Sequence, residues 1–464
     1  KNYTCWYCGY APHQISVVNG LREMLGEDRV LFDEGFDYVI LKSRRTGKYV
    51  RLGENGELIA DAAAEKAEVF ERSDWDFGSW TLRSLKTRKY VTEGGGFVKA
   101  SEENKENGRP SVSLNPGMNC VSDEAFGWFV MELIKAQEEN GVLYLTSWQD
   151  RDMIADETGR IVSAFVPGNG REKEFEAEVL SFGRDRAAKL AGEADYAIVC
   201  AGNHPLINAR EEYDRPDIRL PLAQRALLDA ACGANENTLF YLITGYPFAI
   251  VEERKKAKAV LCSTHLGPSL GRVAADTIFG KNNPAGRTPT TWYRSVRDLP
   301  AIGDYDIMKN RTTYLYFNGE PLYPFGYGLS YTQFAYSNAK AGKKVYGEDE
   351  EITASVTVEN VGSYDGDEVV QLYVVPPKSV YTRPRKMLKA FRRVFVQKSR
   401  SVCVDLAFKV SDLAFWCTDT DSFVVEEGDY VLQIGASSED IRCEVAVHVN
   451  GTVITGRDAQ KKRS

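Results

Sequence analysis

A cluster of charged residues follows a short apolar segment near the middle of this 464-residue chain. Tyr196 to Cys200 are mostly apolar and too few for a helix, and residues 202–205 (Gly-Asn-His-Pro) then interrupt the chain. The next stretch, Arg210 to Arg215, contains the adjacent carboxylates Glu211 and Glu212. Open α/β sheets place their ligand sites at the carboxyl ends of buried strands. We therefore interpret this loop as a candidate site, with a solvated loop of local ion pairs as the alternative.

The elements that must position this loop alternate between apolar runs and helical patterns. Leu220, Ala223, Leu227 and Ala231 recur at helical spacing, and Pro221 suits the first turn of that helix. Further buried strands are predicted at 238–244 and 259–262, further helices at 15–25 and 270–279, and one more strand at 29–32. Strands that alternate with helices predict a mainly parallel sheet that is covered on both faces.

A polar, turn-rich pattern runs from Phe36 to about Phe182. The segment 39–50 (VILKSRRTGKYV) aligns with 80–91 (WTLRSLKTRKYV), and 143–154 (LYLTSWQDRDMI) is a fainter third copy. Three copies of a strand–turn–strand unit, each too small to bury a core alone, predict a β-trefoil. The aromatic residues of this region belong either to its core or to a surface that stacks on the rings of a ligand; they are Trp75, Phe77, Trp80, Tyr90 and Trp148.

From Phe334 onward the pattern is that of an all-β domain. Apolar residues alternate with polar ones between Ile352 and Val358, and predicted strands recur at roughly ten-residue spacing. This pattern predicts a β-sandwich. The tail after Gly451 ends in Gln-Lys-Lys-Arg-Ser and is predicted to be disordered.

Composition argues against several classes of partner and cofactor. A net charge of −8 gives no support to a nucleic-acid or anionic-membrane partner. No apolar run reaches the roughly 18 residues that a membrane helix needs. Nine cysteines show no regular framework, and the Cys5–Cys8 pair lacks the second pair of a zinc site. We expect no metal and no cofactor, and scattered free thiols favour a reducing compartment, the cytoplasm.

Several segments carry a resemblance to a known family. The run 211–221 (EEYDRPDIRLP) resembles the acid/base loop of glycoside hydrolase family three, whose pattern is a Glu, two residues, Asp-Arg and a short run that ends in Leu-Pro. Residues 283–292 (NPAGRTPTTW) and 321–332 (PLYPFGYGLSYT) resemble two other segments of that family. Residues 6–35 resemble the opening of its α/β sandwich domain.

The resemblance implies a multidomain α/β plus all-β architecture. Residues 1–35 and 183–334 would form an α/β sandwich, interrupted by a fascin-like β-trefoil insert at 36–182 and followed by a fibronectin type III-like β-sandwich at 335–450 and a tail at 451–464. It also implies that an Asp nucleophile lies on a preceding β/α-barrel domain, which this sequence lacks. The chain by itself is therefore expected to be inactive. Residues 73–75 (Ser-Asp-Trp) repeat the family's nucleophile tripeptide, but they lie inside the repeat region and are interpreted as a coincidence.

The same resemblance implies roles for the loop residues. A retaining glycosidase uses two carboxylates about 5–5.5 Å apart, and its general acid needs a raised pKa. Glu211 matches the acid/base residue, and Glu212 is the second candidate, since a neighbouring carboxylate can raise a pKa by like-charge repulsion. His204, Glu212 and Arg215 are candidate substrate-binding residues, with support of the loop as the alternative role of His204 and Arg215. His265, at another strand exit, has the same two interpretations.

The predicted function is hydrolysis of O-glycosyl bonds with retention. The chain would supply the acid/base side of a cleft that releases terminal β-linked glucose or xylose from oligosaccharides or glycosides, with the barrel domain as its partner. A glycan-binding or adhesion module without catalysis is the alternative. A glycoside phosphorylase is a third hypothesis, and no motif in the sequence marks a phosphate site.

Overall fold

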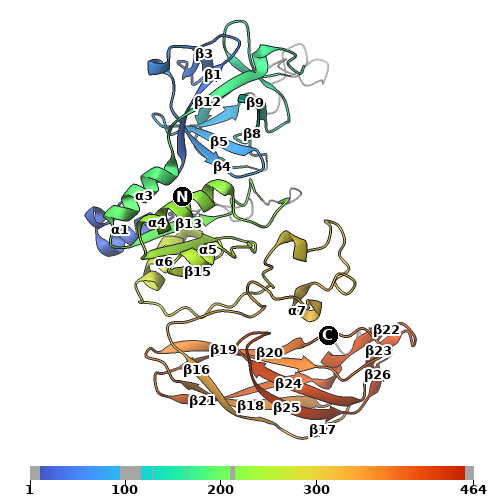
Figure 1. Cartoon of the computed structure of the whole chain (residues 1–464). Helices are drawn as coiled ribbons and strands as arrows, with labels where there is room; N and C mark the ends of the chain where they lie inside the picture. Colours follow the sequence, from blue (N-terminus) through green and yellow to red (C-terminus); the bar gives the residue numbers. More distant parts are fainter. Residues whose placement is uncertain (1–10, 95–115, 128, 165, 209–214, 455–464) are drawn as a thin grey trace. The chain divides into compact units, whose positions relative to one another are not determined.

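The computed structural model describes residues 11–94, 116–127, 129–164, 166–208 and 215–454. The chain forms two compact units, one of residues 1–246 and 250–272 and the other of residues 247–249 and 273–464. The first unit contains an all-β part and an α/β part, and the second contains a connecting segment and an all-β domain (Figure 1). In the ranges given above, no helix is both long and apolar enough to cross a membrane.

A three-stranded parallel sheet organises the α/β part of the first unit. Its strands β13 (Ala197–Gly202), β14 (Thr238–Ile243) and β15 (Ala259–Ser263) are hydrogen-bonded in that order. The helical elements of this part are α1 (Val17–Leu25), η1 (Glu27–Arg29), α3 (Gly183–Glu193), α4 (Leu222–Ala234), α5 (Glu253–Lys256), η4 (Gly267–Ser269) and α6 (Leu270–Ile278), which begins in this unit. The alternation of strands and helices predicted from the sequence is confirmed. Because the three strands are parallel, their carboxyl ends lie at one edge of the sheet.

Two local predictions in this part are wrong. Residues 29–32 do not form a strand: a 3-10 turn ends at Arg29, and the segment that follows is irregular. Leu31 is 54% exposed and Phe32 53% exposed, so this apolar run lies largely in solvent. Pro221 precedes α4 as its N-cap, with φ −50°, and does not occupy the first turn. A short apolar run indicates a strand only where a neighbouring strand is available to pair with it.

In the described residues between 37 and 181, the all-β part of the first unit contains twelve strands. They are β1 (Asp37–Ser43), β2 (Tyr49–Leu52), β3 (Leu58–Ala62), β4 (Phe70–Asp74), β5 (Ser79–Ser84), β6 (Tyr90–Glu93), β7 (Met118–Ser122), β8 (Ile134–Glu139), β9 (Val142–Ser147), β10 (Met153–Ala155), β11 (Ile161–Ser163) and β12 (Glu174–Ser181), with η2 (Ala64–Lys66) and η3 (Arg171–Lys173) between them. The pairings β1–β12, β12–β9, β9–β8, β8–β5, β5–β4 and β4–β1 close a ring of six strands. An apolar cluster around Phe70, Leu82 and Phe175 fills the core of this part.

Each of the three aligned sequence segments forms the same strand–turn–strand unit. The first spans β1 and β2, the second β5 and β6, and the third β9 and β10. Ser43, Ser84 and Ser147 occupy equivalent positions, and all three are fully buried. The backbone N–H of each serine donates across the turn to a carbonyl oxygen, that of Lys48, Lys89 and Arg151, respectively. The internal repeat seen in the sequence therefore corresponds to a repeated backbone unit.

The second unit ends in a domain built mainly from strands. Its strands are β16 (Phe334–Ala341), β17 (Val345–Tyr346), β18 (Glu351–Asn360), β19 (Gly366–Val375), β20 (Met387–Val396), β21 (Ser401–Lys409), β22 (Phe415–Cys417), β23 (Ser422–Val425), β24 (Gly428–Gly435), β25 (Ile441–Val449) and β26 (Thr452–Ile454), with η6 (Val410–Leu413). They form sheets ordered β16-β18-β21, β17-β25-β24-β19-β20 and β22-β23-β26, around one apolar core. The connecting segment before it contains η5 (Val296–Asp298) and α7 (Thr313–Tyr316).

A close-packed glycine turn and the last strand are two local features of this unit. Gly326, in the FGYGLSYT segment, has φ +81°, and a Cβ there would lie 2.0 Å from the side-chain oxygen of Gln371. Gln371 Nε2 in turn donates to the Gly326 carbonyl oxygen at 3.0 Å, so this glycine serves a close-packed turn. The predicted start of the tail is wrong, because β26 pairs with β23 and extends the folded chain to Ile454.

Candidate functional site

The carboxyl ends of the three parallel strands bring together polar residues that are far apart in the sequence. Asn203 follows β13, Thr244 and Gly245 follow β14, and His265 follows β15. The Asn203 side-chain oxygen accepts hydrogen bonds from Thr244 Oγ1 at 2.9 Å and from the Gly245 N–H at 3.0 Å. His265 Nε2 lies 3.3 Å from the same oxygen. These residues form a connected polar cluster at the end of the sheet where the sequence predicted a site, and Asn203 and Thr244 are members that sequence reasoning had not assigned.

Glycine is required at position 202, where the chain leaves β13. Gly202 has φ +149°, and a Cβ there would lie 1.8 Å from the Ile243 carbonyl oxygen on the neighbouring strand. Gln224, from the first turn of α4, clamps the same residue: its Oε1 accepts from the Gly202 N–H and its Nε2 donates to the Gly202 carbonyl oxygen, both at 3.0 Å. The backbone that presents Asn203 is therefore fixed from two sides.

His204 is held inside the turn that follows. Its side chain is 5% exposed, its Nδ1 accepts a hydrogen bond from the Leu206 N–H at 3.2 Å, and its backbone N–H donates to Asn208 Oδ1 at 2.7 Å. Burial, helped by the nearby His265, lowers the pKa of His204 to about 3, and burial also lowers the pKa of His265. A neutral, buried imidazole that organises its own turn favours the loop-supporting role over direct contact with a sugar.

The all-β part of the unit packs directly on this turn. Trp75, between β4 and β5, meets the His204 ring edge to face, with the ring centroids 5.3 Å apart. Trp75 and Val130 also form an apolar cluster with Leu206 and Ile207, with Ala125, Phe126 and Leu133 at its margin. Nothing in the sequence pattern predicted this contact, because Trp75 and His204 are 129 residues apart and each half of the cluster has the apolar composition of an ordinary core. The all-β part therefore supports the segment that leads into the Glu211 loop.

The structure describes only part of the loop that contains Glu211. Glu211, Glu212 and Asp214 lie outside the described residues. Arg215 is partly buried, and its guanidinium lies 5.5 Å from the centroid of the Tyr246 ring, a cation–π distance. This places Arg215 beside the exit of β14, at the same end of the sheet as Asn203.

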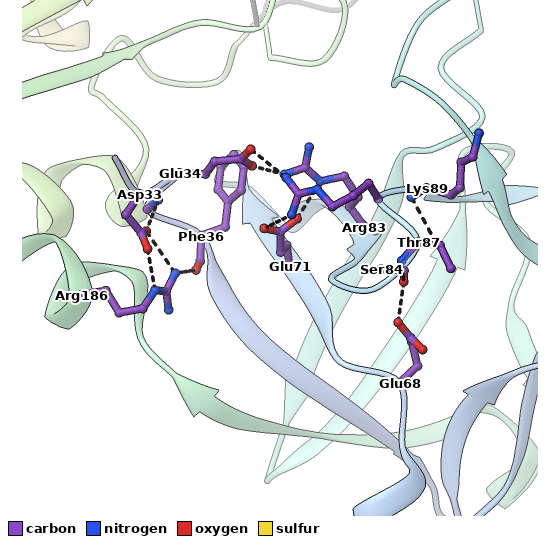
Figure 2. Close-up of polar contacts among 12 residues, drawn as sticks. Asp33, Glu34, Phe36, Glu68, Glu71, Arg83, Ser84, Thr87, Lys89 and Arg186 are labelled. Atoms are coloured by element: carbon purple, nitrogen blue, oxygen red, sulfur yellow. Dashed lines mark hydrogen bonds and ion pairs between the residues drawn. The ribbon is translucent and has the colours of Figure 1, made fainter. Parts of the chain in front are cut away.

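A network of ion pairs ties the all-β part to the segment that enters it from the α/β part (Figure 2). Arg83 donates to Glu71 at 2.7 Å and also pairs with Glu34, while Arg88 contacts the same two carboxylates at 2.7 and 2.8 Å. Glu71 is 3% exposed, and burial raises its pKa despite the neighbouring Arg88. The junction therefore rests on two carboxylates shared by two guanidinium groups.

The helix with which the chain returns to the α/β part is fixed at the same junction. Arg186 on α3 binds Asp33 at 2.9 Å, and its guanidinium also donates to the Phe36 carbonyl oxygen at 2.5 Å (Figure 2). It lies 3.8 Å from the centroid of the Tyr38 ring. One arginine thus joins the chain that leaves the α/β part to the helix with which the chain returns.

The aromatic residues of the all-β part divide between core and surface. Trp75 is 7% exposed and Trp80 9% exposed, whereas Phe77 is 54% exposed. Trp148 is partly buried against Phe129, with ring centroids 5.0 Å apart. Asp74, in the Ser-Asp-Trp tripeptide, ends β4, and its Oδ1 accepts from the Asp76 N–H at 2.9 Å. That bond shapes the turn, which is consistent with the tripeptide being a coincidence. Within the described ranges, no three His, Cys, Asp or Glu side chains gather so as to hold a metal ion.

Comparison with known proteins places this arrangement in a family. Residues 1–331 match the glycosyl hydrolase family 3 C-terminal domain, and residues 368–438 match the fibronectin type III-like domain. The chain is 34% identical to thermostable beta-glucosidase B of Acetivibrio thermocellus over 280 residues, which is 58% of this chain and 37% of that protein. It is 32% identical to an exo-alpha-(1->6)-L-arabinopyranosidase of Bifidobacterium longum over 63% of this chain and 39% of that protein.

Solved structures give the same result. Beta-glucosidase 3B from Thermotoga neapolitana, in complex with alpha-D-glucose, is 28% identical with a TM-score of 0.53, over 59% of this chain and 40% of that chain. The beta-D-glucoside glucohydrolase from Trichoderma reesei is 27% identical with a TM-score of 0.52, over 57% of this chain and 42% of that chain. The chain thus spans less than half the length of these relatives. Because the family match covers well over half of its residues, this chain belongs to the glycosyl hydrolase family 3 C-terminal domain family.

Proposed function

We propose that this chain supplies the acid/base side of a retaining β-glycosidase that releases terminal β-linked glucose or xylose. The observation that carries the proposal is the polar strand-end cluster, in the matched family domain, from which the chain runs directly into the loop that contains Glu211. Relatives named beta-glucosidase support the substrate class. Proteins with other names also match, so the sugar is the least constrained part of the proposal.

In the proposed mechanism Glu211 acts twice. It first donates a proton to the leaving oxygen of the glycosidic bond, and its carboxylate then takes a proton from the water that hydrolyses the glycosyl-enzyme. The nucleophile is an Asp on a β/α-barrel domain that acts together with this chain. Glu212 is the alternative acid/base residue or a sugar ligand, and Arg215 orients substrate or loop beside Tyr246. His204 contributes through the turn that it organises.

We also propose finer identities for the domains. The closed ring of six strands and the three repeated strand–turn–strand units support a β-trefoil at 36–182. This insert would interrupt an α/β sandwich made of residues 1–35 and 183–334. The all-β domain that follows contains the fibronectin type III-like segment.

The direct test compares two neighbouring carboxylates in the enzyme with its barrel domain present. Glu211→Gln should lower kcat/KM for alkyl β-glucosides by about 10²–10⁴-fold, the usual contribution of a general acid, while Glu212→Gln should change it by less than tenfold. Xylosides assayed in parallel identify the preferred sugar. Loss of activity in Glu212→Gln with normal turnover by Glu211→Gln would reverse the assignment.

Glycan binding without catalysis remains the second candidate, and one observation favours it. Phe77 is 54% exposed, and Phe129, which is 39% exposed, lies against Trp148. Aromatic faces of this kind bind sugar rings. If the chain by itself is retained on a β-glucan column and Trp148→Ala abolishes retention, the binding function stands. Trp80 is unsuitable for this test because it is buried in the core.

A further inference from the structure

The orientation of the Asn203 amide is fixed by an unambiguous donor. The Gly245 backbone N–H lies 3.0 Å from one terminal atom of the side chain, and a backbone N–H can only donate. That atom must therefore be the oxygen, Oδ1, which also accepts the hydrogen bond from Thr244 Oγ1. The other terminal atom, Nδ2, carries two protons.

Those two protons have no acceptor in the part of the chain that the structure describes. Asn203 is 1% exposed, and its Nδ2 is buried without a hydrogen-bond partner. Buried amides in native proteins are almost always satisfied on both ends, so an orphaned donor needs a functional or structural explanation. This one sits at the carboxyl ends of parallel strands, where α/β folds bind their ligands.

We propose that Asn203 is a substrate-binding residue whose Nδ2 donates to a hydroxyl oxygen of the glycoside. The inference rests on the proposed function and adds a specificity residue to it. Oδ1 is the structural end of the side chain, held by the β14 exit, and Nδ2 is the ligand end. The backbone beneath it is fixed by the Gln224 clamp on Gly202, so the donor is oriented before the sugar arrives.

The contrast with a second asparagine shows why the orphaned donor is informative. Asn235 follows α4, and its Nδ2 donates to two carbonyl oxygens, of Ala191 at 2.9 Å and of Ala194 at 2.8 Å. That amide is fully used in tying α4 to α3. Asn235 is therefore a structural asparagine and a matched control for Asn203.

The test is a coupling experiment in the enzyme with its barrel domain. kcat/KM is measured for p-nitrophenyl β-D-glucoside and its monodeoxy analogues, with wild type and with Asn203→Asp, which keeps the acceptor for Gly245 and replaces the donor. We expect a loss of about tenfold on the parent substrate and little or no loss on the one analogue that lacks the contacted hydroxyl. If the carboxylate prevents folding, Asn203→Ala repeats the comparison without a buried charge.

Each other outcome overturns the inference. Equal losses on every analogue would make Asn203 a structural residue, as would a lower Tm with unchanged kinetics, the result expected for Asn235→Asp. If the variant shifts the basic limb of the pH–rate profile but loses the same factor on every deoxy analogue, the acceptor of the Asn203 Nδ2 protons is a group of the protein and not a hydroxyl of the substrate. If the wild type cleaves no β-glucoside or β-xyloside at all, the proposed function fails and the inference fails with it.

Discussion

Replacement of Trp75 tests whether the all-β part of the first unit supports the proposed acid/base loop or is merely attached to the fold. Trp75 is 7% exposed and packs on His204, Leu206 and Ile207, only four to seven residues before Glu211. Truncating a buried Trp to Ala costs about 3–5 kcal/mol of stability, of which the edge-to-face ring contact contributes about 0.5–1.5 kcal/mol. Trp75→Ala therefore removes most of the apolar support of this turn.

The effect on catalysis should depend on the leaving group. A displacement of about 1 Å can cost about 100-fold when it affects a group that must reach a reacting atom. Proton donation matters most for poor leaving groups, so Trp75→Ala should lower kcat/KM about 10- to 100-fold for an alkyl β-glucoside and less than threefold for 2,4-dinitrophenyl β-glucoside. kcat/KM reports the first, acid-assisted step. It is obtained from initial rates measured well below the Tm of the less stable variant.

Trp80 provides the matched control. It is 9% exposed, belongs to the core of the same all-β part, and carries Arg72 4.7 Å above its ring, without membership in the cluster on Leu206. Trp80→Ala should cost similar stability and leave the leaving-group dependence unchanged. If both variants lower kcat/KM by the same factor for every leaving group, the insert does not position the loop and the reasoning is refuted.

Three further predictions concern stability. His204 stays neutral in the folded state down to about pH 3 but protonates near pH 6.5 when unfolded. The contribution of His204 to the free energy of unfolding is therefore complete above pH 6.5 and falls on acidification, by up to about 1.4 kcal/mol per pH unit between these two values. Urea titrations of His204→Asn should show a shallower fall of the free energy of unfolding with decreasing pH. Arg83→Met leaves the buried carboxylate of Glu71, which is 3% exposed, with one guanidinium fewer, and should lower the free energy of chemical unfolding by about 3–5 kcal/mol. Combining Arg83→Met with Glu71→Leu should restore most of that loss. A double variant whose losses simply add would contradict this prediction. Gly202→Ala forces a Cβ against the Ile243 carbonyl oxygen and should lower Tm. Gly233→Ala is the control: it lies in α4, its Cβ would meet nothing outside its own helix within 4 Å, and it should gain about 0.5–1 kcal/mol of stability. A wild-type Tm for Gly202→Ala would show that the neighbouring strand can move to accept the Cβ.

Local patterns in the sequence determined most of the helices and strands, and they indicated the end of the parallel sheet at which the candidate site lies. Apolar runs between Gly and Pro breaks predicted β13, β14 and β15, because buried parallel strands read as nearly continuous hydrophobic segments. The repeat at residues 39, 80 and 143 predicted three like units, since equivalent turns need equivalent residues. The same reasoning failed at Leu31 and Phe32, where pairing and not apolarity decides whether a strand forms.

Only the tertiary structure decided which residues surround the site. Sequence spacing carries no information about the contact of Trp75 with His204, or about the meeting of Asn203, Thr244 and His265, because chain reversals between separate elements create both. The sequence marked His204 as a chemical candidate by its residue type, and burial then made it a neutral part of the turn. It left Asn203 without a role, because an asparagine becomes informative only when its oxygen is seen to be satisfied and its nitrogen is not.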